Sequence, residues 1–266
     1  MHIKVAAIQM VSGINLEHNM ATAERLLEQA AEQGAQWALL PEYWPIMGRK
    51  DTDKLVLAEP FGQGVLQAFL ANTARRLNMV IIGGTIPLQS GDDTKVLNTL
   101  LTYNREGELI GRYDKMHLFG FQGLGESYQE SDTIQAGSEL PKLVIDGIGV
   151  AQGICYDVRF PEFFRAQLPF DVMVLPAAFT HTTGQAHWEL LLRARAVENQ
   201  CYVLASGQGG VHESGRQTWG QSMLIDPWGN IVNQLANHEG VVIADIDTQK
   251  VESVRSKLPA LRHRCL

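Results

Sequence analysis

The chain has 266 residues, of which 45% are hydrophobic and 19% charged, so it can bury a large core. Its formal net charge of -7 argues against a nucleic-acid binder, which usually presents a basic face. This composition excludes an intrinsically disordered chain and favours a protein that acts on small molecules.

The cysteine content and the first residues of the chain indicate where the protein works. The three cysteines are an odd number, lie far apart and form no CxxC pair: Cys155, Cys201 and Cys265. They do not form a disulfide framework, which suggests a reducing compartment. The first ten residues lack the apolar core of a signal peptide, and no apolar run approaches the ~18 residues of a membrane span. We therefore expect a cytoplasmic protein.

The first half of the chain mixes βα alternation with a hairpin. Asn15 is placed to cap a helix that Gly34 ends, and a second helix is expected at about 63–77. A long Gly-rich stretch, 119–139, shows little periodicity, which is typical of a functional loop. Strands are expected at 2–10, 37–42, 79–85, 96–103 and 108–113.

The second half continues the same mixture without a linker, a repeat or a break in composition. Helices are expected at 161–168, at about 184–199 and after the last strand. Strands are expected at about 142–146, 148–155, 171–176, 201–206, 220–226, 230–235 and 241–246. We therefore predict one α/β domain, residues 1–266, with helices covering a largely β interior.

Three polar residues lie at or just beyond the ends of apolar strands: Glu42, Lys115 and Cys155. Strand ends on a rigid sheet often carry sites, and these residue types suit acyl chemistry. A carboxylate takes the thiol proton, the thiolate attacks a carbonyl, and the ammonium faces the developing negative charge. Spacing alone leaves ordinary alternatives open: a solvated Glu42, a surface pair between Lys115 and Asp114, and a buried, inert Cys155.

Three segments resemble the signature motifs of the nitrilase superfamily of carbon–nitrogen hydrolases, in that family's order. They are Leu40-Pro41-Glu42, Asp114-Lys115-Met116-His117-Leu118 and the decapeptide from Gly153 to Glu162. The resemblance extends over essentially the whole chain. It implies an α-β-β-α sandwich that pairs through its helices into a homodimer of four stacked layers, sometimes assembling further.

The resemblance also implies the roles of the residues that match. Cys155 is the nucleophile, Glu42 the general base and Lys115 the oxyanion stabiliser, with the backbone N–H of Tyr156 as a second oxyanion donor. The family has a second glutamate after the lysine motif. This glutamate matches Glu130, and Glu126 is the nearby competitor.

The implied reaction hydrolyses an amide through a thioester and releases ammonia, with no metal or organic cofactor. None of the eight histidines shows a recognised metal-ligand spacing, so no metal is expected. The expected partner is a small-molecule amide, with neither nucleic acid nor membrane.

Residues 179–200 indicate the branch of the superfamily and so the class of substrate, because they look like a segment of omega-amidases and deaminated glutathione amidases. Residues 201–212 and 222–229 favour the deaminated glutathione side. A carboxylate on the substrate would favour a planar guanidinium as its partner, and the resemblance implies Arg159, four residues after Cys155, for this role. Phe179 and Thr183 match positions that line the pocket, and core packing is the open alternative for Phe179.

Other specificities on the same triad stay open. They are an omega-amidase acting on α-ketoglutaramate, a carbamoylase and a true nitrilase. An alternative outside the enzymes is a non-catalytic scaffold that kept the fold. The loss of a triad residue would favour this alternative. All three triad residues are present.

Overall fold

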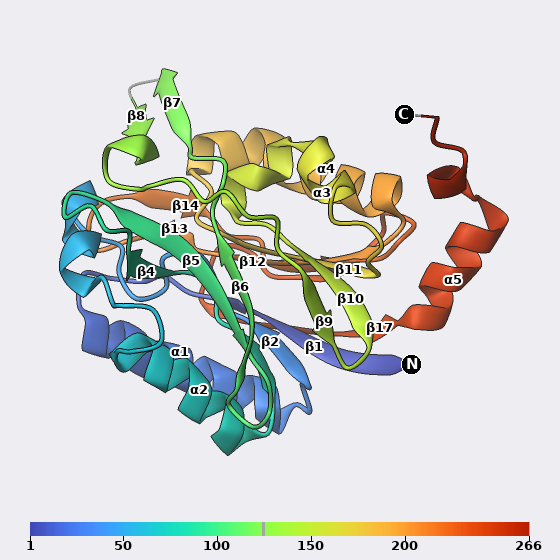
Figure 1. Cartoon of the computed structure of the whole chain (residues 1–266), viewed down its shortest axis with the longest axis horizontal. Helices are drawn as coiled ribbons and strands as arrows, with labels where there is room; N and C mark the ends of the chain where they lie inside the picture. Colours follow the sequence, from blue (N-terminus) through green and yellow to red (C-terminus); the bar gives the residue numbers. More distant parts are fainter. Residues whose placement is uncertain (124–125, 266) are drawn as a thin grey trace.

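Two β-sheets lie face to face between two layers of helices. The structure, a computed structural model, describes residues 1–123 and 126–265, without the side chain of Glu126. Figure 1 shows α1 (Leu16–Glu32) and α2 (Val65–Leu77) below the sheets, with α3 (Pro161–Arg165) and α4 (His181–Asn199) above them. This arrangement is the predicted α-β-β-α sandwich.

The first sheet joins the N-terminal half of the chain to its last strand. Its order is β17-β1-β2-β3-β5-β4, and β6 pairs with β5. Its strands are β1 (His2–Gln9), β2 (Trp37–Leu39), β3 (Val80–Ile82), β4 (Ile86–Gln89), β5 (Val96–Tyr103), β6 (Leu109–Asp114) and β17 (Gly240–Asp247).

The second sheet is built from the C-terminal half, and its order is β16-β15-β12-β11-β10-β9. The strands β10, β11 and β12 run parallel, so their carboxyl ends meet at one edge. Its strands are β9 (Leu143–Ile145), β10 (Ile148–Gln152), β11 (Val172–Ala177), β12 (Tyr202–Gly207), β15 (Met223–Ile225) and β16 (Ile231–Gln234).

The strand β1 shows how the layers are held together. Val5 and Ala7 point into the core between the two sheets, whereas Ala6 and Ile8 belong to the core beneath α1 and α2. Successive side chains of a strand point to opposite faces, so one run of apolar residues serves both cores. The continuous apolar sequence of this strand follows from its burial on both sides.

Most of the expected helices and strands are present, with boundaries shifted by a few residues. Asn15 caps α1 as expected, since its side chain accepts a hydrogen bond from the backbone N–H of His18 at 2.8 Å. The strand expected at 148–155 is shorter than predicted, because β10 ends at Gln152 and a 3₁₀ turn begins at Cys155. The helix α5 (Thr248–Lys257) follows the last strand, as expected.

The stretch 119–139 is more regular than its sequence indicates. It contains a two-stranded antiparallel hairpin of β7 (Gly120–Gly123) and β8 (Glu126–Gln129), followed by a 3₁₀ turn from Glu130 to Asp132. A second short pair, β13 (Gly209–Val211) and β14 (Gln217–Trp219), was also not predicted. In both pairs the strands are short and partly exposed, so they show little hydrophobic periodicity.

A search of the described residues for a membrane-crossing helix was negative, because no helix among them combines the necessary length and apolar character.

Candidate active site

Cys155 begins the 3₁₀ turn Cys155–Arg159, directly beyond the end of β10. Its backbone φ is 48°, in the left-handed region that residues other than glycine seldom adopt. The surrounding core holds this conformation, since Ile154 and Val158 on either side are fully buried. The cysteine itself is 8% exposed and lines a pocket, so the thiol is held rigidly at the pocket surface.

Glu42 lies three residues beyond the end of β2 and is buried, with 1% of its surface exposed. Its Oε1 atom accepts hydrogen bonds from Lys115 Nζ at 2.9 Å and from Asn98 Nδ2 at 2.9 Å. Its Oε2 atom accepts one from the backbone N–H of Ala178 at 2.8 Å. The alternative of a solvated Glu42 is therefore wrong.

Lys115 follows β6 directly and is completely buried. Its Nζ atom donates to Glu42 and also to both carboxylate oxygens of Glu130, at 2.9 and 2.8 Å. The alternative of a surface pair with Asp114 is wrong, because Asp114 binds Arg112 at 2.9 Å instead. One buried ammonium thus bridges two carboxylates.

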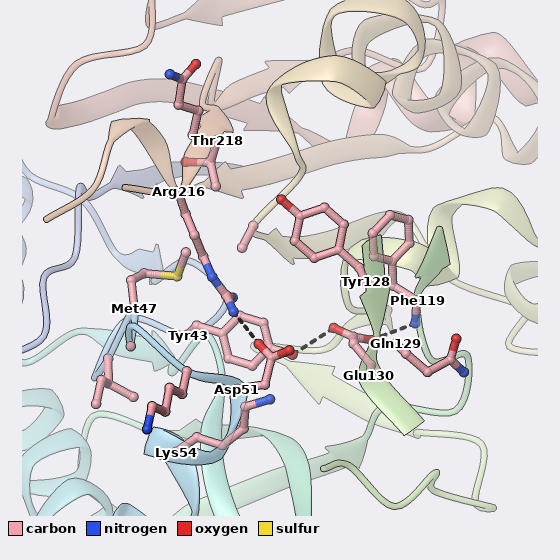
Figure 2. A pocket seen from close by; sticks show the side chains of 15 residues that line it. Tyr43, Met47, Asp51, Lys54, Phe119, Tyr128, Gln129, Glu130, Arg216 and Thr218 are labelled. Atoms are coloured by element: carbon pink, nitrogen blue, oxygen red, sulfur yellow. Dashed lines mark hydrogen bonds and ion pairs between the residues drawn. The ribbon is translucent and has the colours of Figure 1, made fainter. Parts of the chain in front are cut away.

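Glu130 is held on several sides (Figure 2). In addition to Lys115, it accepts hydrogen bonds from the Tyr43 hydroxyl and from the backbone N–H of Phe119, both at 2.7 Å. Glu130 therefore belongs to the same hydrogen-bonded cluster as Lys115 and Glu42. The competing position, Glu126, has a side chain that lies outside the described residues.

Burial decides the resting charges of this cluster. Burial and the nearby Glu42 raise the pKa of the Cys155 thiol well above its ordinary value, although Lys115 opposes the shift. Burial also raises the pKa of Glu42. Burial alone would lower the pKa of Lys115, but Glu130 and Glu42 raise it well above its ordinary value. The resting site therefore holds a neutral thiol beside a permanent ammonium.

Asp157 joins two of the motifs and was missed by the sequence reasoning. This buried carboxylate accepts hydrogen bonds from the backbone N–H of Ile154 at 2.8 Å and from the Tyr113 hydroxyl at 2.7 Å. It also contacts His117 Nδ1 at 2.7 Å. It therefore connects the segment of Lys115 to the turn of Cys155. The only sequence signal was the presence of Asp157 in the decapeptide.

The pocket beside Cys155 contains the residues expected to bind substrate. We call it the acyl lobe, and it is lined by Phe119, Cys155, Tyr156, Arg159, Ala178, Phe179, Thr180 and Thr183.

Arg159 lies over two aromatic rings of the acyl lobe, with Cζ 5.4 Å from the ring centre of Phe179 and 5.7 Å from that of Tyr156. Its polar contact is with His187 Nδ1 at 3.3 Å, and among the described residues no carboxylate lies within 4.0 Å of it. A guanidinium without a carboxylate partner among the described residues is available to an anion.

The other two expected pocket residues have structural contacts as well. Phe179 packs on Trp188 with ring centres 5.0 Å apart, so it serves the core and the acyl lobe together. The hydroxyl of Thr183 lies 2.8 Å from that of Thr180, at the start of α4. A search of the described residues for three or more His, Cys, Asp or Glu side chains able to hold a metal ion found no such group.

Comparison with known proteins places this geometry in a family. Residues 4–256 match the family model for carbon–nitrogen hydrolases. The chain is 40% identical over 265 residues to a deaminated glutathione amidase of Synechocystis sp., covering 97% of both proteins. It is 34% identical over 276 residues to the omega-amidase NIT2 of Danio rerio, covering 98% of this chain and 94% of that protein.

A solved structure agrees with these relatives. The crystal structure of Nit3 from Saccharomyces cerevisiae, a member of branch 10 of the nitrilase superfamily, superimposes with a TM-score of 0.89. The two chains are 30% identical, and the match covers 100% of this chain and 97% of that one. The chain thus belongs to the carbon–nitrogen hydrolase family, as its three motifs predicted, and is an enzyme that acts on carbon–nitrogen bonds.

Proposed function

We propose that the chain is a cysteine-dependent amidase that acts on the amide of a small α-keto acid, with deaminated glutathione as its substrate. The observation that carries this proposal is the buried Glu42–Lys115–Glu130 cluster beside Cys155, at the edge of a lobe that contains Arg159. The relatives named deaminated glutathione amidase and omega-amidase support the choice of substrate.

In the first half of the reaction, Cys155 Sγ attacks the amide carbonyl while Glu42 takes the thiol proton. The carbonyl oxygen becomes an oxyanion beside Lys115 and the backbone N–H of Tyr156. The intermediate collapses to a thioester, and Glu42 returns the proton to the departing amine. In the second half, Glu42 removes a proton from water, and the resulting hydroxide attacks the thioester. The carbon–sulfur bond breaks to give the free acid, and the departing Cys155 thiolate takes the proton back from Glu42.

The departing amine depends on the substrate. Deaminated glutathione carries a ketone where glutathione has its glutamyl amino group, so cleavage of its side-chain amide gives α-ketoglutarate and cysteinylglycine. The primary amide α-ketoglutaramate gives the same acid and ammonia. The expected release of ammonia therefore applies to primary amides only, and α-ketoglutarate is the product to measure for both.

Arg159 supports an acidic acyl group. A guanidinium without a carboxylate partner among the described residues can bind the α-keto carboxylate in a bidentate manner. Phe179 and Thr183 border the same lobe and would enclose the carbon chain. Carbamoylases and nitrilases use the same nucleophile. The test below therefore includes a substrate for each of these alternatives.

We further propose that residues 1–266 form a single carbon–nitrogen hydrolase domain that works as a homodimer in the cytoplasm. The three cysteines are all free, as expected in a reducing compartment. The dimer is supported by apolar side chains exposed on α4, Leu190 and Val197.

The test measures α-ketoglutarate release from deaminated glutathione and α-ketoglutaramate, and ammonia release from a ureido acid and a simple nitrile. We expect turnover of the two keto-acid amides. Cys155→Ala should abolish it, and Glu42→Gln should lower kcat by about 10²–10⁴-fold. Turnover that survives Cys155→Ala would sink the mechanism. Folded protein that is silent on every substrate would revive the scaffold alternative.

A further inference from the structure

A second, larger cavity adjoins the acyl lobe, and we call it the outer lobe. It encloses about 730 Å³ including its open mouth, against about 210 Å³ for the acyl lobe. Phe119 and Ala178 line both lobes, so the two spaces adjoin at these residues, and Cys155 lines the acyl lobe. Figure 2 shows the outer lobe between Met47 on one side and Tyr128 and Phe119 on the other.

The position of the outer lobe assigns it to the leaving amine. In the proposed reaction the acyl group occupies the lobe with Arg159, and the group on the far side of the scissile bond must lie beyond Cys155. Departing ammonia needs almost no space, whereas a leaving dipeptide needs a cavity of this kind. The outer lobe therefore fits amides whose nitrogen carries a substituent.

Most charges that line the outer lobe are already satisfied. Arg216 pairs with Asp51, as the dashed line in Figure 2 shows. Glu130 is bound by Lys115, by the Tyr43 hydroxyl and by a backbone N–H. The charges of Arg216, Asp51 and Glu130 are therefore not available to a ligand.

Lys54 is different. It comes from the 3₁₀ helix Asp51–Leu57, is half-buried, and lies over the ring of Tyr43 with Nζ 5.5 Å from the ring centre. Its ammonium donates one hydrogen bond, to Thr133 Oγ1 at 2.9 Å, although an ammonium carries three donors. Among the described residues no carboxylate lies within 4.0 Å of it. This ammonium is available to an anion in the outer lobe.

We propose that Lys54 binds a carboxylate on the leaving amine, so that the enzyme selects N-substituted amides with an acid at each end. This inference rests on the proposed function and deepens it. Arg159 would hold the α-keto carboxylate, and Lys54 the C-terminal carboxylate of the departing peptide. Deaminated glutathione has both groups. α-Ketoglutaramate has only the first, so it leaves the outer lobe empty.

The test compares three substrates, each followed by α-ketoglutarate release: deaminated glutathione, its C-terminal carboxamide and α-ketoglutaramate. Lys54→Gln should lower kcat/KM for deaminated glutathione roughly tenfold, the usual scale for losing one charge-assisted hydrogen bond. For the wild-type enzyme, kcat/KM for the carboxamide should be lower than kcat/KM for deaminated glutathione by a similar factor. On the carboxamide, kcat/KM of Lys54→Gln should be close to that of the wild-type enzyme, because this substrate lacks the carboxylate that Lys54 would bind. Turnover of α-ketoglutaramate should change less than about twofold.

Two variants serve as controls. Lys54→Arg keeps the charge and should restore most of the activity on deaminated glutathione. Lys142→Gln makes the same charge change at an exposed position outside both lobes and should have no effect.

The outcomes separate this proposal from the proposed function. Equal losses on all three substrates would show a structural role for Lys54 and overturn the proposal. Additive losses from Lys54→Gln and the carboxamide would overturn it as well. An enzyme that hydrolyses none of the three would remove the proposed function, and this proposal with it.

Discussion

The chemistry of Cys155 follows from its surroundings more than from its own acidity. Burial and Glu42 raise the pKa of the thiol, so the resting nucleophile is protonated. A buried carboxylate next to it becomes an effective base once substrate supplies an acceptor for the electron pair. In the reaction that we propose, the site therefore needs no histidine and holds no reactive thiolate between turnovers.

The raised pKa of Cys155 can be measured by thiolate absorbance near 240 nm during a pH titration. A higher pKa means that more base is required for ionisation, so Cys155 should contribute no step around the ~8.5 of an ordinary thiol. Subtracting the titration of Cys155→Ala removes the exposed Cys265 from the result, and burial raises the pKa of Cys201 above this range. A difference step near or below pH 8.5 would contradict the buried, neutral thiol.

At the scale of residues, the motifs predicted the side chains to which we assign the chemistry, but not the side chains that hold them in place. Glu42, Lys115 and Cys155 were named because their segments match a family pattern. Tyr43 and Asp157 were missed, since their roles depend on contacts between distant segments. The presence of Asp157 in the decapeptide does not show which distant residues it contacts.

At the scale of the elements, the site depends on how strand ends are fixed to one another. β6 leads into Lys115 in the first sheet, and β10 leads toward Cys155 in the second. Asp157 spans the two, because it binds Tyr113 from β6 and Ile154 beside the nucleophile. The active site is therefore assembled by contact between the sheets rather than by one strand end alone.

We expect Asp157→Asn to reduce the free energy of unfolding by about 2–3 kcal/mol, because it weakens several hydrogen bonds to a buried carboxylate. Activity should fall as well, since the turn of Cys155 loses its attachment. Urea denaturation and kcat provide the measurements.

Tyr113→Phe is the matched control for this change. It removes one hydrogen bond to the same carboxylate, and we expect it to cost about 1 kcal/mol. If Asp157→Asn cost no more than Tyr113→Phe, Asp157 would not connect the two sheets.

The elements missed from the sequence were missed for two different physical reasons. β4 contains Pro87, which argues against a strand, but β4 lies at the end of its sheet where proline is tolerated. The hairpin of β7 and β8 is short and partly exposed. The long strands β1 and β5 were predicted well, because burial leaves a clear apolar pattern.

At the scale of the whole molecule, the two helical layers differ in what they expose. Leu190 and Val197 lie seven positions apart on one face of α4 and are 67% and 50% exposed. The turn that contains Trp228 adjoins this face, because Arg193 Nε donates to the carbonyl of Gly229 at 2.8 Å. Large apolar side chains exposed close together favour pairing with a second copy.

A charged residue on this face should separate the proposed dimer. We expect Leu190→Asp combined with Val197→Asp to weaken association at least about a hundredfold, since an unpaired charge at an interface costs about 3 kcal/mol or more. Light scattering coupled to gel filtration measures the change.

Val65→Asp is the control, because Val65 is 63% exposed on α2 in the opposite layer. The Val65→Asp variant should have the same molar mass in solution as the wild-type dimer. A wild-type chain that runs as a monomer, or a dimer lost through Val65→Asp alone, would contradict pairing through α4.

The base of the β7–β8 hairpin determines what a change in the hairpin would affect. The backbone N–H of Glu130 donates to the carbonyl of Phe119 at 2.9 Å, and the backbone N–H of Phe119 donates to the Glu130 carboxylate at 2.7 Å. These two bonds close the hairpin where it joins the body, so Glu130 keeps its place whatever lies between them. A hairpin of another length or sequence between these two bonds would change the wall that Tyr128 and Gln129 give to the outer lobe and leave the Glu130 carboxylate in place.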